Sequence, residues 1–181
     1  MIVCAGRNET FDFATPIGVG LIESAMNLSK LILSNKPEFL LFIGSAGSYG
    51  KHKIFDIVTS KTAANIELGF LDKLCYTPLE SEISLEESQN VPRETLNIIN
   101  SSNYITTDSV SSRKLLTLGL QLENMEFFSL LRIAKEYDIP TKGIFIVTNY
   151  CDTNARKDFL NNHKKAKQLL TDYMENYNEK K

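Results

Sequence analysis

Two stretches of this 181-residue chain are apolar with almost no alternation: FLLFI at 39–43 and KGIFIVTNY at 142–150. A strand with one solvated face alternates apolar and polar residues, whereas a strand covered on both faces reads as a nearly continuous apolar run. Both stretches therefore predict interior strands of a sheet. Because such strands need a helical layer on each face, the pattern indicates a three-layer α/β domain.

Helical spacing separates these strands and follows them. Apolar residues recur at intervals of three and four over 21–33, 124–139 and 158–177, which predicts three helices. Shorter strands are predicted at 1–5, 10–15, 56–60 and 104–107. The acidic, proline-containing segment 76–103 predicts a surface excursion with one short helix near its end. No repeat or linker divides the chain, so we expect one domain over residues 1–181, with a mixed central sheet flanked by helices.

Charge and cysteine content exclude several classes of protein. The formal net charge of −2 gives no general attraction to nucleic acid or to an anionic membrane. The three cysteines are odd in number, far apart and outside any CxxC motif, so neither a zinc site nor a disulfide framework is expected. No apolar stretch approaches the roughly 20 residues of a membrane span, and the N-terminus does not resemble a signal peptide. We expect a cytoplasmic protein without nucleic-acid or membrane partners.

A glycine- and serine-rich loop, GSAGSYGK at 44–51, follows the first interior strand. Ligands of α/β sheets gather at the carboxyl ends of strands, so this loop is a candidate binding site. It is not a P-loop, because Ser45 replaces the first glycine of that motif and His52 replaces its Ser/Thr. A serine hydroxyl and successive amide hydrogens can hold an anion or a ribose hydroxyl without a metal. Alternatively, the glycines only permit a turn.

A second glycine pair, GVG at 18–20, opens the helix predicted at 21–33. A dinucleotide-binding loop would need a third glycine where Glu23 stands, together with a preceding buried strand. Neither requirement is met, so a dinucleotide is not expected here.

Four segments, taken in order, resemble the nucleoside phosphorylase/nucleosidase family. FIGSAGSYGKHKIFDIVTS is similar to that family's strand, G-[ST]-[AC]-G loop and following strand, and ENMEFFSLLRIAKEYDIP is similar to its Met-Glu signature and helix. TPIGVGLIESAMNLSKLI and GIFIVTNYCD resemble its G-x-G helix start and last core strand. The set covers most of residues 11–155. The resemblance implies a phosphorylase-like fold, a nucleoside substrate, no cofactor and a homo-oligomer (a dimer or higher).

The resemblance also implies roles for individual residues at the sugar and the base. Glu126 would accept hydrogen bonds from ribose hydroxyls, a task that suits an acceptor-only carboxylate, and Met125 would pack under the sugar ring. Alternatively, Glu126 is only a helix-start residue favoured by the helix dipole. Asn149 would bind the base with its amide donor and acceptor, which indicates 6-oxopurine nucleosides. Asp152 could replace the acid that some relatives carry, but a loop-capping role is preferred.

The remaining assignments concern phosphate and the rest of the substrate. Ser45, Gly6 and Arg7 would bind inorganic phosphate as a co-substrate. The resemblance further implies that Gly47, in the loop after the first interior strand, and Asp108, near the family's base-stacking segment, contribute to nucleoside binding.

The expected activity is that of a purine nucleoside phosphorylase, which releases the free base and ribose 1-phosphate. The first alternative is a nucleosidase of the methylthioadenosine/adenosylhomocysteine type, in which Glu9 would act as the general base that activates water. The second is a catalytically weakened nucleoside-binding relative. The choice between phosphate and water depends on Arg7 and Glu9.

Overall fold

Two long parallel strands form the centre of the structure. In the computed structural model, which describes residues 1–86 and 91–178, β3 (Leu40–Ser48) pairs with β9 (Thr141–Tyr150) along its whole length. Both strands are buried at nearly every position, as their apolar sequences predict. Phe42 points into one hydrophobic core and Ile43 into another on the opposite face. The sheet is therefore covered on both sides.

The described residues form a mixed sheet of nine strands around this pair. β3 is parallel to β1 and antiparallel to β8, while β4 pairs antiparallel with β9. The other strands extend the sheet in the order β2-β1-β3-β8-β7-β5-β6. The bounds are β1 (Ile2–Cys4), β2 (Thr15–Pro16), β4 (Ile57–Ser60), β5 (Thr62–Ala64), β6 (Glu82–Ser84), β7 (Ile98–Ser101) and β8 (Leu120–Asn124).

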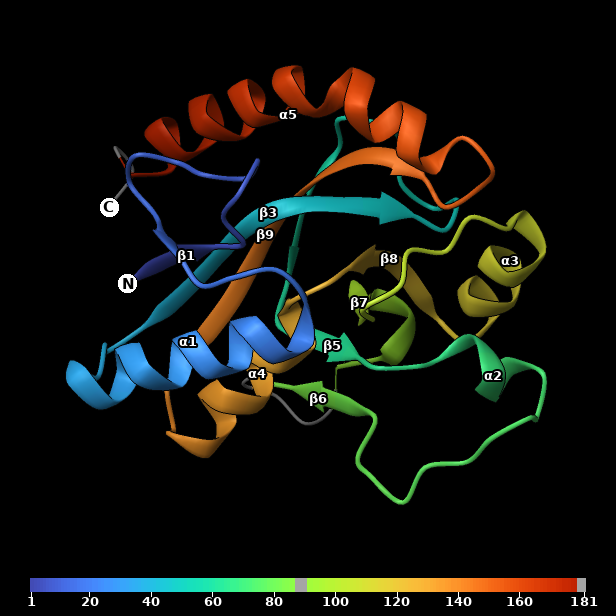
Figure 1. Ribbon diagram of the computed structural model, residues 1–181, viewed down its shortest axis with the longest axis horizontal. Coiled ribbons are helices and arrows are strands. Elements are labelled where there is room, and N and C mark those ends of the chain that lie inside the picture. The colour runs from blue at the N-terminus through green and yellow to red at the C-terminus, as the bar shows by residue number, and fades with distance from the viewer. Residues whose placement is uncertain (87–90, 179–181) are drawn as a thin grey trace.

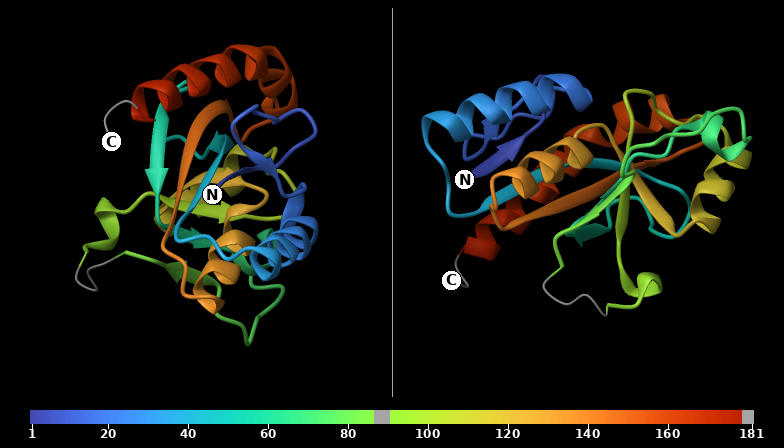
Figure 2. Two further views of the ribbon diagram at one scale, coloured as in Figure 1. Left: turned by 90° about the vertical axis from the view of Figure 1, so that its left-hand side faces the viewer. Right: turned by 90° about the horizontal axis from the view of Figure 1, so that it is seen from below.

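Helices cover both faces of the sheet (Figure 1). The long α5 (Ala155–Asn178) lies on one face, and α1 (Gly20–Ser34) packs beside α4 (Phe127–Glu136) on the other, as Figure 2 also shows. The short α2 (Leu68–Leu71) contacts α3 (Ser109–Thr117), and one turn of 3₁₀ helix spans Arg93–Thr95. This arrangement confirms the predicted three-layer α/β fold with a mixed sheet.

The sequence-based prediction is wrong for the part of the sheet that includes β6 and β7. Segment 76–103, predicted as a surface excursion, contains β6 and the buried β7, where Ile98 and Ile99 have no exposed surface. Its residues 87–90 lie outside the described residues. A run of two isoleucines between polar residues is too short to predict an interior strand. The predicted strand at 104–107 is a loop, and β5, β8 and α3 were not predicted.

Gly143 permits the closest aromatic packing in the core. Phe42, Phe127 and Phe145 form a cluster whose ring centroids are 5.0–6.0 Å apart. A Cβ on Gly143 would lie 2.4 Å from Phe145 and 2.7 Å from Phe127. We expect Gly143→Ala to lower the free energy of unfolding by about 1–3 kcal/mol in urea denaturation, because the rings must move.

Gly69→Ala is the matched control. The added methyl group would lie 3.3 Å from the Sγ atom of Cys75, which is exposed and can move. Alanine is also favoured over glycine in a helix such as α2. We expect this variant to be as stable as the wild type or more so. Equal stability of the two variants would contradict the account of the aromatic cluster.

Candidate functional site

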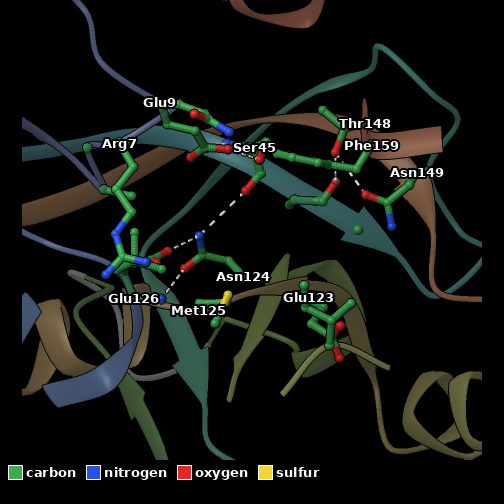
Figure 3. Close-up of a pocket in the computed structure, with 17 residues that line it drawn as sticks. Arg7, Glu9, Ser45, Glu123, Asn124, Met125, Glu126, Thr148, Asn149 and Phe159 are labelled. Atoms are coloured by element: carbon green, nitrogen blue, oxygen red, sulfur yellow. Dashed lines mark hydrogen bonds between the residues drawn. The ribbon is translucent and has the colours of Figure 1, made fainter. Parts of the chain in front are cut away.

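A cavity of about 250 Å³ lies where β3, β8 and β9 end (Figure 3). It is lined by residues from all three strands, from the loop after β1 and from α5. Eight of the residues predicted as site residues line it: Gly6, Arg7, Glu9, Ser45, Gly47, Met125, Glu126 and Asn149. The fold thus brings together residues that lie up to 143 positions apart in the chain (Gly6 and Asn149), while their chemical roles stay predictions.

Glu9 reaches the cavity from a tight turn after β1. Two backbone hydrogen bonds between Gly6 and Glu9, of 2.9 and 3.3 Å, close this turn, and Gly6 adopts a positive φ of 97°. The Ser45 hydroxyl donates to Glu9 Oε1, and the Ser45 amide donates to Oε2 at 3.4 Å. The turn therefore holds the Glu9 carboxylate against Ser45 of β3. There the carboxylate can accept a proton from a water molecule in the cavity.

The Arg7 guanidinium lies at the rim of the cavity. Its guanidinium donates to Glu23 Oε1 at 3.3 Å, and 70% of its side-chain surface is exposed. The same Glu23 carboxylate accepts from the Val19 amide at 2.9 Å, which holds it at the start of α1. Arg7 is the only cationic side chain among the described residues that line the cavity. The cation expected for phosphate is thus already paired with a carboxylate.

Glu126 is a buried carboxylate with two protein donors. Its Oε1 accepts from the Gly20 amide at 2.9 Å, and its Oε2 accepts from Asn124 Nδ2 at 2.8 Å. The pKa of Glu126 is raised to about 7, mainly by burial and also by the nearby Glu9 charge, while the two hydrogen bonds oppose the shift. Each oxygen keeps a lone pair for a hydroxyl group of a ligand, because a carboxylate offers about four acceptor sites.

Asn124 orients Glu126 and was missed in the sequence. Its Oδ1 accepts from the backbone amides of Glu126 and Phe127, both at 2.8 Å, while its Nδ2 donates to the Glu126 carboxylate. The side chain is thereby fixed at both ends. An Asn at the start of a predicted helix, here the one predicted over 124–139, is a capping signal that could have identified it.

A β-bulge shapes the opposite side of the cavity. The pairing of β3 with β9 shifts between Ala46 and Gly47, so that Thr148 has no counterpart in β3. The Thr148 hydroxyl donates to Asn149 Oδ1 at 2.9 Å, and Asn149 Nδ2 donates to the Tyr150 carbonyl at 3.0 Å. One amide hydrogen of Asn149 stays available. Bulges commonly re-aim side chains beside functional sites.

Gly47 is required by close packing at this bulge. A Cβ on Gly47 would lie 2.7 Å from Cys151 Sγ and 3.0 Å from Asn149 Nδ2. Any side chain here would displace the Asn149 amide.

Asp108 does not reach the cavity, contrary to the prediction that it contacts the substrate. It is the N-cap of α3, where its Oδ2 accepts from the Ser111 amide at 2.7 Å. This hydrogen bond lowers the pKa of Asp108 below its usual value. Asp152 likewise accepts from the Asn154 amide, at 2.7 Å, as expected of a capping residue.

The apolar wall of the cavity includes Phe159 of α5 and Ile105 of the loop before α3. Neither was predicted as a site residue, because each reaches the cavity only through long-range packing. In Figure 3, Thr148, Asn149 and Phe159 lie toward one end of the drawn group, and Arg7 and Glu126 lie toward the other. The cavity therefore offers the Glu126 carboxylate toward one end and the Asn149 amide with the Phe159 ring toward the other.

Two negative findings apply to the described part of the chain. Residues 1–86 and 91–178 contain no group of three or more His, Cys, Asp or Glu side chains that could hold a metal ion. Within the same ranges, every helix is too short or too polar to span a bilayer.

Solved structures with the same fold are nucleosidases and a related hydrolase. A mutant Helicobacter pylori 5′-methylthioadenosine nucleosidase with 5′-methylthioadenosine in its active site is 16% identical, with a TM-score of 0.80 over 99% of this chain and 97% of that one. A mutant of H. pylori futalosine hydrolase is 18% identical, with a TM-score of 0.78 over 96% and 95% of the two chains. The Streptococcus pneumoniae methylthioadenosine/S-adenosylhomocysteine nucleosidase with a transition-state inhibitor is 13% identical, with a TM-score of 0.75 over 96% and 95%.

These similarities establish the fold, which is the one that the sequence resemblance implied. No protein-family model matches the sequence, and no curated protein sequence matches it significantly.

The buried Glu126 gives the protein a characteristic pH dependence. Its pKa is about 7 in the folded chain, against 4.5 for an unperturbed glutamate, so between these values the folded chain keeps a proton that the unfolded chain has released. The free energy of unfolding should therefore fall as pH rises from 4.5 to about 7. We expect Glu126 to contribute a loss of roughly 2–4 kcal/mol across this window.

Urea denaturation of the wild type and Glu126→Gln, each at both ends of this window, measures that contribution. Glutamine does not titrate, so the variant should lose less stability than the wild type as pH rises. Its amide mismatches Asn124 at every pH, so only the change with pH is compared. The same change in both proteins would show that Glu126 ionises without cost in the folded chain.

Proposed function

We propose that this protein hydrolyses the N-glycosidic bond of a purine nucleoside, with Glu9 as the general base. The observation that carries the proposal is the Glu9 carboxylate, held by Ser45 inside a cavity that Glu126 and Asn149 also line. The nucleosidases and the futalosine hydrolase that share the fold support it. The proposal follows the alternative, rather than the first choice, of the sequence analysis.

The proposed reaction begins with a water molecule between Glu9 and the sugar. Glu9 accepts a proton from this water as its oxygen forms a bond to C1′. The bond from C1′ to the base nitrogen breaks, and its electron pair leaves with the base. The anionic base then takes up a proton, and Glu9 releases the one it accepted, so that water is added across the bond. Glu126 accepts hydrogen bonds from the ribose hydroxyls, and Met125 packs against the sugar. General-base catalysis by a positioned carboxylate contributes about 10²–10⁴-fold to such a reaction.

Asn149 would bind the departing base. Its amide orientation is fixed by Thr148 and Tyr150, and its remaining amide hydrogen can be donated to a purine nitrogen. An amide donates a hydrogen bond but cannot give up a proton, so the base must accept the electron pair largely unaided. A 6-oxopurine spreads that charge onto its exocyclic oxygen. This chemistry favours hypoxanthine or guanine over adenine as the base.

Electrostatics favours water over phosphate as the nucleophile. Glu9 and Glu126 both line the cavity, and the charge of each raises the energy of an anion placed between them. The nearest cation, Arg7, is paired with Glu23 at the rim. The predicted phosphate site of Ser45, Gly6 and Arg7 would therefore place a dianion beside carboxylates without a free positive charge. Phosphorolysis is thus the less favourable reaction.

The first experiment is an activity assay without phosphate. We expect release of the free base together with ribose from inosine, or with the correspondingly substituted sugar from 5′-methylthioadenosine or futalosine, the nucleosides for which the similar structures are named. Glu9→Gln keeps an oxygen that can accept from Ser45 but removes the base. It should lower kcat by about 10²–10⁴-fold while nucleoside binding persists.

Arg7→Ala is the control that separates water from phosphate. Its exposed side chain should matter little to hydrolysis, so kcat/KM should stay within about threefold of wild type. Turnover that requires phosphate and is lost in Arg7→Ala would instead establish a phosphorylase. Binding of nucleosides without any turnover would establish a catalytically weakened relative.

We also propose that the protein is a homo-oligomer, a dimer or higher, as the sequence resemblance implies. Several large apolar side chains around α2 are exposed, which is unusual for a monomer surface. They are Leu68, Phe70, Leu74, Tyr76 and Leu79. Light scattering at micromolar concentration should give at least twice the chain mass of 20.4 kDa. A mass of one chain at all concentrations would refute it.

A further inference from the structure

The loop between β7 and α3 separates two cavities. Ile105 lines the candidate site, whereas Tyr104 and Thr106, on either side of it, line a second cavity of about 170 Å³. Glu123 of β8 lines both cavities. We call residues 104–106 the partition, because successive side chains of this segment face opposite cavities.

The partition is anchored at both ends and exposed between them. On one side, Asn103 Oδ1 accepts from the Leu21 amide at 2.9 Å. On the other, Thr106 is buried and bonded to Glu123. Tyr104 is 80% exposed and Ile105 is 57% exposed, so neither is held by burial. The position of Ile105 against the candidate site therefore depends on the two anchors.

Glu123 supplies the stronger anchor. Its Oε1 accepts from the Thr106 amide at 2.8 Å, and its Oε2 accepts from the Thr106 hydroxyl at 2.5 Å. The Tyr49 hydroxyl donates to the same Oε2 at 2.7 Å, and Cys151 Sγ lies 3.9 Å from Oε1. Figure 3 shows Glu123 turned away from Ser45 and Asn149. The carboxylate thus serves the partition rather than the interior of the candidate site.

A buried carboxylate at this position needs a reason. Glu123 is only 5% exposed, and burial raises its pKa. An apolar side chain of similar size would fill the same space without loss of hydration. What the carboxylate adds is a set of directional hydrogen bonds, two of them to one loop residue.

We propose that Glu123 is a positioning residue that holds the partition as the wall of the nucleoside cavity. It acts through Thr106 and does not touch the reacting atoms. The inference rests on the proposed function, because the ligand whose affinity it sets is the nucleoside. When the anchor is lost, Ile105 no longer confines the ligand and the two cavities join. The nucleoside KM then rises, while kcat of the bound substrate changes little.

Two substitutions each remove one hydroxyl group from the same carboxylate oxygen. Thr106→Val deletes a hydrogen bond that joins the partition to Glu123. Tyr49→Phe deletes a hydrogen bond to the same carboxylate oxygen that does not involve the partition. We expect Thr106→Val to raise the nucleoside KM about 5- to 10-fold, with kcat within about twofold of wild type, whereas Tyr49→Phe leaves KM within about twofold. A purely structural role would lower thermal stability in both variants and raise KM in neither.

Substitutions of Glu123 itself give a graded comparison. Glu123→Gln keeps an oxygen for the Thr106 amide, and the two hydroxyl groups can turn to accept from its own amide. It should retain most of the nucleoside affinity. Glu123→Leu removes both bonds to Thr106 and should show the largest rise in KM. Equal KM values for the two Glu123 variants would overturn the proposal.

A fluorescence measurement tests the partition without any enzyme assay. The chain contains no tryptophan, so Tyr104→Trp introduces a single reporter on the partition. Its fluorescence anisotropy should fall when Thr106→Val or Glu123→Leu is added and should not change with Tyr49→Phe. Unchanged anisotropy in every variant would refute the anchor. If the wild type turns over no nucleoside, the proposed function fails, but this measurement still decides the role of Glu123.

Discussion

The parallel pairing of β3 with β9 is the constraint on which the rest of the structure depends. Nine residue pairs align the two strands, and a single register shift falls at their carboxyl ends. Because both strands end at the same edge of the sheet, Ser45 and Asn149 enter one cavity although they are far apart in the chain. The apolar layers under α5 and α4 bury both strands and fix that edge. The remaining site residues are attached to this frame.

The chemistry of the cavity follows from the balance of charge that this frame imposes. Three carboxylates, those of Glu9, Glu123 and Glu126, line a cavity whose only described cation, Arg7, is paired at the rim with Glu23. Such a site can polarise water and hold hydroxyl groups, but it does not attract a phosphate dianion. Burial, with a smaller contribution from the Glu9 charge, raises the pKa of Glu126 in this cavity. Hydrolysis therefore fits the electrostatics better than the phosphorolysis that the sequence first suggested.

The sequence predicts those features that depend on local patterns. The interior strands, the long helices and the positions of Ser45 and Asn149 at strand ends follow from apolar runs and the polar residues after them. The direction of the Arg7 side chain could not be predicted, because it is decided by an ion pair with Glu23, 16 positions away in the chain. The presence of Phe159 and Glu123 at the cavity could not be predicted either, because their contacts are made only when distant segments pack together. Strand β7 could not be recognised because only two of its four buried residues, Ile98 and Ile99, are apolar.

In the proposed function, Ser45, Glu126 and Asn149 hold one nucleoside between them. A crystal structure with a non-hydrolysable 6-oxopurine nucleoside analogue tests it most directly. We expect ribose hydroxyls within hydrogen-bonding distance of the Glu126 carboxylate, the purine beside Asn149 and Phe159, and a water molecule between Glu9 and C1′. Density for the analogue outside this cavity, or a phosphate ion bound between Ser45 and Arg7, would refute this binding mode.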